Sequence, residues 1–258
     1  MLIQFSVRNF RTFKEKATLS LVASNYDKDT RKDENIFEDD KFNLNILKSA
    51  VIYGANASGK SKFIDALLFM QGFVTKSSKD SQKGELISVE PFKLSAETEN
   101  SPSEFEVVFT LNSTMYRYGF EVNSKQVVSE WLFHKSNAKE VELFYRDLQT
   151  FNTHPRSFSK SKAVIKAGMV RDNALLLSVA AQFNEQTASL VLSWFQELSI
   201  IGLHESRFKN NTISKIKDKK GKIKVLDFLK AADLGIHDIH YEEFNKEVSD
   251  QIKDALKV

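Results

Sequence analysis

Residues 51–67 read VIYGANASGKSKFIDAL, and the order of residue types in this stretch decides the fold class. A run of apolar residues leads into a glycine-containing turn, after which apolar side chains recur at the spacing of an amphipathic helix. We therefore predict a buried strand over 47–53, a loop over 54–59 and a helix from Lys60 to about Phe73. A strand that enters a helix through such a loop is typical of α/β domains.

The loop matches the pattern G-x-x-x-x-G-K-[S/T] at Gly54, Gly59, Lys60 and Ser61. In this pattern the glycines let the backbone curl, so that its N–H groups and the N-terminus of the following helix point at phosphate oxygens. The lysine reaches the β- and γ-phosphates, and the serine hydroxyl ligates Mg²⁺. Average residue frequencies would produce the four fixed positions by chance in roughly 1% of chains of this length. The loop therefore predicts a site for a nucleoside triphosphate and its Mg²⁺.

The composition narrows the class of protein. The chain has 258 residues, of which 41% are hydrophobic and 28% are charged, as in ordinary globular proteins. Its 37 basic and 34 acidic residues leave a net charge of +3, which argues against a surface covered in nucleic acid but allows a local basic patch. The absence of cysteine excludes disulfides and thiolate metal sites. Since the sequence shows no signal peptide and no run of about 18 apolar residues, we expect a cytoplasmic protein without a membrane partner.

Alternating apolar and polar residues predict a mainly antiparallel sheet in the first part of the chain. Residues 2–8 and 17–23 alternate at period two and are expected to pair, and a polar surface loop is expected over 25–43. Short alternating runs separated by turn-like segments over 85–146 predict an antiparallel β meander that extends the same sheet. Together with the phosphate loop, these elements make up the first expected domain, residues 1–146.

The second expected domain, residues 147–258, is helical. An irregular basic segment over 147–170 precedes apolar residues at helical spacing over 173–201, which predict one long helix or two. Residues 209–224 then hold seven lysines and one aspartate. A solvated mobile loop is the favoured interpretation of this lysine run. Contact with nucleic-acid phosphates is the alternative, although no aromatic residue lies within the run to stack on bases.

Three stretches resemble ABC-type ATPase heads of the SMC, RecF and OLD-nuclease kind, and more closely the AAA-type ATPase core proteins of bacterial abortive-infection and phage-defence systems. The first is IQFSVRNFRTF at 3–13, which is similar to the N-terminal strand and N-F-[RK]-[ST]-F turn that these proteins place before the phosphate loop. The second is the loop itself, with Asn56 at the position that this group favours. The third is NALLLSVAAQFN at 173–184, which resembles the segment carrying the Q-loop glutamine and places that residue at Gln182.

The resemblance implies a fold class and a site. The fold would be an α/β P-loop NTPase similar to an ABC-ATPase head, with an antiparallel β subdomain and a helical C-terminal segment, and its cofactors would be ATP and Mg²⁺. Asn9 and Arg11 would lie beside the nucleotide, and Gln182 would lie near Mg²⁺ and the attacking water. The alternatives are a solvated turn for Arg11 and a helix surface for Gln182. The implied cofactor-binding residues are Asn9, Arg11, Gly54, Asn56, Ala57, Ser58, Gly59, Lys60, Ser61 and Lys62. The implied catalytic residues are Lys60 and Gln182, and the implied metal ligands are Ser61 and Gln182.

Hydrolysis needs elements that the sequence does not show. Phosphoryl transfer to water requires a further carboxylate on the Mg²⁺ side, a residue that orients the water, and stabilisation of the developing charge. In the group that the chain resembles, these come from a Walker B strand and from an L-S-G-G-like signature of a partner. Neither pattern occurs in the sequence, and VLDF at 225–228 lies in a helical pattern. We therefore expect ATP binding, with little hydrolysis unless another chain supplies the missing lobe.

The resemblance also implies a function. The chain would be an ATP-binding, ATPase-family protein whose nucleotide-driven head dimerisation gates an effector in bacterial defence or DNA maintenance. Its expected partners are an effector protein and either a second copy, in a nucleotide-sandwiched dimer, or a chain that supplies the C-terminal lobe. Two alternatives stay open: a nucleotide-responsive scaffold subunit without hydrolysis, and a DNA-repair ATPase head of the RecF kind. DNA binding that weakens when Lys219 and Lys220 are neutralised would favour the last of these.

Overall fold

The computed structural model describes residues 1–24, 31–80, 82–200, 207–233 and 235–242. The chain falls into two compact units, Met1–Ile200 and Ile201–Val258. This division differs from the expected boundary between residues 146 and 147. Strand β8 (Val141–Asp147) runs across that boundary and pairs with the strand that follows it, so the sheet continues there without a break.

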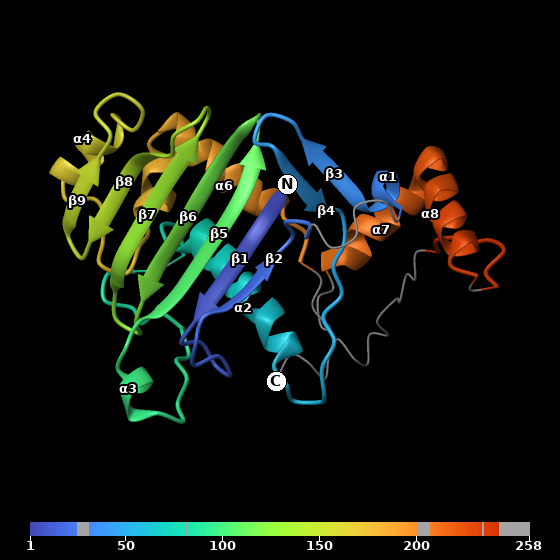
Figure 1. Ribbon diagram of the computed structural model, residues 1–258, viewed down its shortest axis with the longest axis horizontal. Coiled ribbons are helices and arrows are strands. Elements are labelled where there is room, and N and C mark those ends of the chain that lie inside the picture. Colours follow the sequence, from blue (N-terminus) through green and yellow to red (C-terminus); the bar gives the residue numbers. More distant parts are fainter. Residues whose placement is uncertain (25–30, 81, 201–206, 234, 243–258) are drawn as a thin grey trace, which may run out of the picture. The chain divides into compact units, whose positions relative to one another are not determined.

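Seven strands form an antiparallel sheet in the first unit (Figure 1). In spatial order they are β2 (Ala17–Ser20), β1 (Leu2–Arg8), β5 (Ser103–Leu111), β6 (Thr114–Val122), β7 (Val127–Lys135), β8 and β9 (Thr150–Thr153). Successive side chains of a strand point to opposite faces of its sheet, which is why the period-two runs of the sequence form these strands. The predicted pairing of the first two strands and the meander are confirmed, although the alternating run at 87–94 does not join the sheet.

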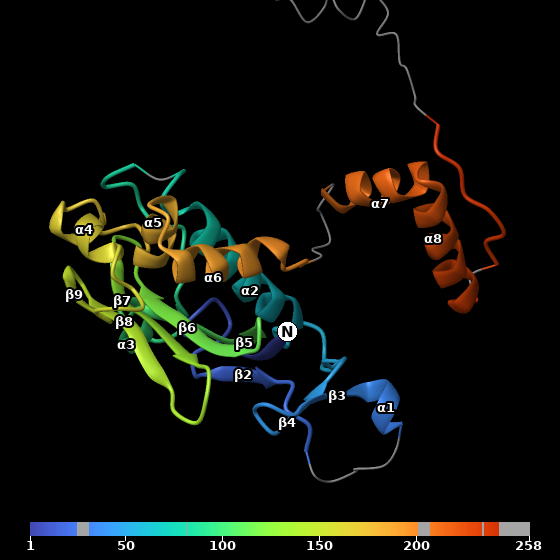
Figure 2. The same cartoon turned by 90° about the horizontal axis from the view of Figure 1, so that it is seen from above.

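Helices cover one face of this sheet (Figure 2). They are α2 (Lys60–Lys76), α5 (Leu176–Gln182) and α6 (Gln186–Glu197), with the short helix α4 (Ser161–Lys166) beside α5. The short helix α3 (Ala96–Glu99), which precedes β5, lies beyond the end of the strands in Figure 1. Aromatic rings fill the space between the layers: Phe5 meets Phe63 edge-on at 5.2 Å between ring centroids, and Phe109 stacks on Trp194 at 3.9 Å. Burial of each such side chain contributes about 1.5–3 kcal/mol. The predicted helix from Lys60 is confirmed, and the helical pattern over 173–201 forms two helices.

The connection between β2 and the phosphate loop is more regular than expected. In place of a surface loop over 25–43, helix α1 (Lys32–Asn35) leads into a hairpin of β3 (Ile36–Asp39) and β4 (Leu44–Leu47). The end of this hairpin is tied to the main sheet, because Leu47 N–H donates to the Leu21 carbonyl at 2.7 Å. The surface-loop prediction is therefore wrong for the part of this segment that the structure describes.

The buried strand expected over 47–53 is also wrong. Regular pairing ends at Leu47, and Val51, Ile52 and Tyr53 are 70%, 43% and 87% exposed. A strand needs a neighbour to satisfy its backbone hydrogen bonds, and within the described residues no strand lies beside 49–53. The apolar, β-branched sequence favours a strand, but the described fold supplies no partner for it.

The second unit contains a helical hairpin, α7 (Arg207–Lys217) and α8 (Lys219–Ala231). The favoured prediction of a mobile loop over the lysine run 209–224 is therefore wrong. Lysine is a good helix former, and the Asp218 carboxylate accepts a hydrogen bond from the Gly221 N–H at 2.8 Å, which caps the start of α8. The VLDF stretch at 225–228 lies inside α8, as its helical pattern indicated.

Candidate phosphate-binding site

The phosphate loop curls through two left-handed residues. Ala57 has a φ of 63°, and Gly59, the N-cap of α2, has a φ of 96°. A Cβ added at Gly59 would lie 3.1 Å from Thr12 Oγ1, so this position combines a backbone conformation that favours glycine with a close neighbour. A Cβ at Gly54 would lie 2.6 Å from Ser58 Oγ. Gly59 is therefore needed by the shape of the loop, whereas a Cβ at Gly54 would require only a rotation of the Ser58 hydroxyl.

The loop presents the N-terminus of α2 to solvent. This helix is 17 residues long, no side chain caps its first turn, and that turn holds no acidic residue. The first N–H groups of a helix have no partner within the helix, and its dipole places partial positive charge at the same end. Residues 54–58 and Ser61 are all exposed. Free donors, positive potential and exposure together suit the binding of a phosphate group.

The Lys60 side chain lies across the loop. Its Nζ donates hydrogen bonds to the carbonyl oxygens of Gly54 and Ala55, each at 2.7 Å. These bonds hold the ammonium group over the loop. From this position it would contact a bound phosphate. A phosphate oxygen is a charged acceptor and forms a stronger bond to an ammonium than a neutral carbonyl does. Lys60 is therefore placed to exchange carbonyl partners for a phosphate.

An apolar pocket of about 260 Å³ adjoins the loop. Ser58, Gly59 and Lys60 form its polar side. The remaining walls come from the N-terminal turn, β2, the segment before the loop and α2, through Phe13, Ala17, Thr18, Leu19, Ile52, Tyr53 and Phe63. A pocket with aromatic and aliphatic walls next to phosphate donors suits a ligand with a flat apolar end and an anionic end.

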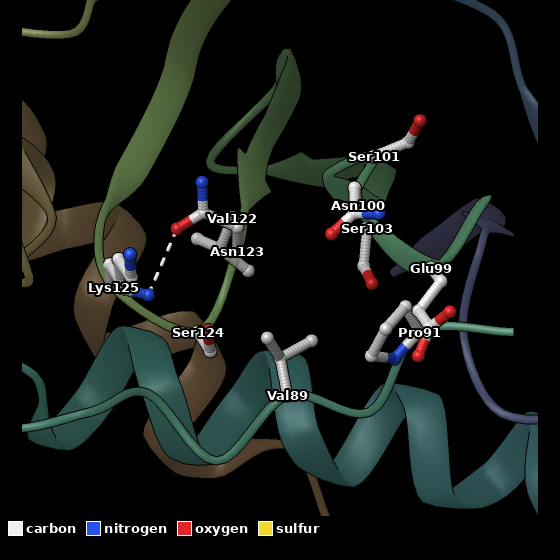
Figure 3. A pocket seen from close by; sticks show the side chains of 10 residues that line it. All are labelled: Val89, Pro91, Glu99, Asn100, Ser101, Ser103, Val122, Asn123, Ser124 and Lys125. Atoms are coloured by element: carbon white, nitrogen blue, oxygen red, sulfur yellow. Dashed lines mark hydrogen bonds between the residues drawn. The ribbon is translucent and has the colours of Figure 1, made fainter. Parts of the chain in front are cut away.

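Asn9 does not face this pocket. Its side chain is buried, its Nδ2 donates to the carbonyls of Thr98 and Ser101 at 2.8 Å each, and its Oδ1 accepts from the Phe92 N–H at 3.0 Å. The amide thus fixes the segment between α2 and β5. A separate pocket of about 220 Å³ lies along this segment, and none of the residues predicted for nucleotide binding lines it (Figure 3). The Asn9 side chain therefore holds this segment in place, and it does not lie beside the phosphate loop as the resemblance implied.

Arg11 and Lys62 lie together, but on another side of α2 from the loop pocket. Arg11 Nη1 donates to Asp65 Oδ2 at 2.5 Å, and Lys62 Nζ bonds the same oxygen at 3.1 Å. At about 100° per residue, Lys62 and Asp65 lie on the opposite side of the helix from Lys60. Arg11 and Lys62 line a pocket of about 370 Å³ that does not include the loop. Their charges are thus already paired with a carboxylate, away from the uncapped helix end.

The structure does not bring Gln182 to Ser61. Gln182 is exposed at the end of α5, and α5 contacts the far end of α2, where Ser178 Oγ lies 2.9 Å from Ser78 Oγ. Ser61 and Ser77 are separated along α2 by about 24 Å, from a rise of about 1.5 Å per residue. The segment that resembles a Q-loop therefore packs at the opposite end of the helix from the predicted metal ligand.

Sequence reasoning missed the residues that support the loop. Thr12 and Phe13 lie directly against Gly59, and Leu19, Ile52 and Tyr53 line the adjoining pocket. The sequence signal for Thr12 and Phe13 was the N-F-R-T-F turn at 9–13. In the same turn, the family resemblance pointed to Asn9 and Arg11. Leu19 comes from β2, which only the fold brings to the loop, whereas Ile52 and Tyr53 directly precede the loop in the sequence.

Comparison with known families agrees with the loop. A family model described as "AAA domain, putative AbiEii toxin, Type IV TA system" matches residues 49–255. The chain belongs to this AAA family. The match confirms an AAA, P-loop ATPase-type domain, and it supports nucleotide binding. The comparison with curated proteins gave no match. Among the helices that the structure describes, none has the length and apolar content to cross a bilayer.

Proposed function

We propose that this AAA domain binds ATP with Mg²⁺ at residues 54–61. The observation that carries the proposal is the exposed and uncapped N-terminus of α2, behind a loop that curls through Ala57 and Gly59. The backbone N–H groups of the loop and the first turn would hold the phosphates, and Lys60 would exchange its carbonyl partners for them. The exposed Ser61 hydroxyl would hold Mg²⁺, which neutralises phosphate charge when it is bound. The apolar pocket would take the base.

The geometry favours ATP binding without ATP hydrolysis by this chain alone. This is the alternative of a nucleotide-responsive scaffold subunit. Asp65 is the first acidic residue after Ser61 in α2, and it is paired with Arg11 and Lys62. Gln182 is exposed at the end of α5, the helix that meets the far end of α2 through Ser178. Hydrolysis needs a carboxylate and a water-orienting group beside the metal, and none of the described residues that line the loop pocket is acidic. A second chain would therefore supply these groups.

We also propose that nucleotide binding drives association with that second chain and thereby gates an effector. Val51, Ile52 and Tyr53 support this step, because they are exposed apolar residues directly before the loop. Exposed apolar surface of this kind is typical of an interaction site. A role in bacterial defence agrees with the description of the family, which names a toxin of a type IV toxin–antitoxin system.

Calorimetry of Mg-ATP binding, together with a turnover assay, tests the proposal. The wild-type chain should bind ATP, and Lys60→Ala should abolish binding. Lys62→Ala is a matched control in the same helical turn and should keep binding, because Lys62 is directed to Asp65. Absence of binding by the wild type, or an equal loss in both variants, would overturn the site. Steady turnover by the isolated chain that depends on Lys60 would overturn the scaffold-type alternative.

A further inference from the structure

Helix α8 has two sides with different exposure. Gly221, Lys222, Val225, Leu226 and Leu229 are partly covered and lie on the side that packs toward α7. The packing is close, since a Cβ added at Gly221 would lie 2.4 Å from the Lys215 carbonyl oxygen. The other side is exposed and consists of Lys219, Lys220, Ile223, Lys224, Asp227, Phe228, Lys230 and Ala231. We call this exposed set the outer side of α8.

The outer side of α8 is strongly basic. It holds four lysines and a single aspartate. Other lysines of the hairpin are engaged: Lys222 pairs with Asp238 at 2.8 Å, and Lys217 lies over the Tyr241 ring at 4.4 Å. Within the part of the chain that the structure describes, the four outer lysines make no ion pair. Their positive charge is therefore available to an anionic partner.

Two large apolar side chains lie among these lysines. Ile223 is 52% exposed and Phe228 is 73% exposed. Phe228 follows Lys224 by four residues, so the two side chains are neighbours on the helix surface. The lysine run itself contains no aromatic residue, but the helix brings one from just beyond the run to its side. An exposed ring beside free ammonium groups can stack on a base while the lysines contact phosphates.

We propose that the outer side of α8 binds single-stranded nucleic acid. Its four lysines would contact backbone phosphates over about 16 Å of helix, the rise from Lys219 to Lys230, and the Phe228 ring would stack on an unpaired base. A membrane surface fits less well, because the more apolar side of α8 is covered by α7 and the side facing solvent is the charged one. Duplex DNA fits less well because its bases are already stacked. The proposal does not depend on nucleotide binding at the phosphate loop.

Fluorescence anisotropy of a labelled oligothymidylate, titrated with the full chain at several salt concentrations, tests the role of the lysines. If four phosphates are neutralised, log K should fall with log[salt] with a slope of about −2.8. Lys219→Gln/Lys220→Gln should weaken binding and make the slope shallower by about 1.4. Lys79→Gln/Lys83→Gln is the matched control, since it removes two exposed lysines from the first unit and should change neither quantity. Equal effects of the two pairs would overturn the proposal.

The role of the ring has its own variants. Phe228→Ala should lower the affinity on the order of tenfold and leave the salt slope unchanged. Phe228→Leu should also weaken binding, because leucine keeps apolar surface but cannot stack. Unchanged affinity in both variants, equal binding to a duplex of the same length, or binding to phosphatidylserine vesicles but not to the oligonucleotide would each overturn the proposal. Lys60→Ala should bind the oligonucleotide normally, which separates this result from failure of the nucleotide site.

Discussion

Glu130 and Arg146 face each other on neighbouring strands, both fully buried, with Arg146 Nη1 3.8 Å from Glu130 Oε2. The Glu130 carboxylate also accepts hydrogen bonds from the N–H groups of Leu176 and Leu177, at 2.6 and 3.0 Å. Burial raises the pKa of Glu130, while Arg146 and these N–H groups act in the opposite direction. The pair therefore fixes the first turn of α5 on the sheet, and with it the position of Gln182 away from the phosphate loop.

Removing one member of this buried pair should cost much stability. Glu130→Ala leaves Arg146 buried without its partner and the start of α5 uncapped, so we expect a loss of about 3–5 kcal/mol in the free energy of unfolding. Urea denaturation measures this loss. Glu140→Ala is the control, because it removes a more exposed partner of Arg117 and should cost less than about 1 kcal/mol. Similar small losses in both variants would show that the buried pair does not anchor α5.

Two glycines associated with α2 should respond differently to alanine. Gly59→Ala forces a Cβ into left-handed backbone beside Thr12, so the loop should deform and ATP binding should be lost. Gly72→Ala adds a Cβ to the same helix where no atom lies within 4 Å, so it should leave binding intact and stabilise the helix by about 0.5–1 kcal/mol. Calorimetry with ATP and thermal unfolding give both quantities. Normal ATP affinity in Gly59→Ala would contradict the assigned loop geometry.

Asn9→Ala should act on stability rather than on the nucleotide. The substitution leaves the Phe92 N–H and the carbonyls of Thr98 and Ser101 without the buried amide, which should cost about 1–3 kcal/mol. ATP affinity, measured at a temperature where the variant is fully folded, should be unchanged. The reverse result, with normal stability and lost affinity, would favour the ligand contact that the family resemblance implied.

Val51→Ser tests the exposed segment before the loop, because Val51, unlike Ile52 and Tyr53, does not line the pocket proposed for the base. Since this side chain is 70% exposed, its replacement should change the free energy of unfolding by less than about 0.5 kcal/mol. If the segment is an association surface, ATP-dependent assembly with the second chain should nevertheless weaken, which analytical ultracentrifugation can detect. Unchanged assembly would place the interface elsewhere on the AAA domain.

Local sequence rules predicted the elements whose shape depends on a few adjacent residues. The pattern of Gly54, Gly59, Lys60 and Ser61 located the loop and the start of α2, and period-two alternation located most strands of the sheet. These predictions hold because turn geometry, helix starts and strand faces are determined by residues close together in the chain. The same reasoning wrongly predicted a strand over 47–53. The apolar sequence there is typical of a strand, but no described strand lies beside it to pair with it.

The sequence by itself determined the phosphate loop, the antiparallel meander, the helix from Lys60 and the helical pattern over 173–201, since each depends on local backbone preference and hydrophobic period. Only the tertiary structure decided what those elements meet. Asn9 holds the segment around Thr98, the helix that ends at Gln182 contacts the far end of α2, and Phe228 lies beside Lys224 on one side of α8. Such relationships depend on hydrogen bonds and packing between distant parts of the chain, or on whether a segment is helical at all, and the spacing of residues in one segment does not encode them.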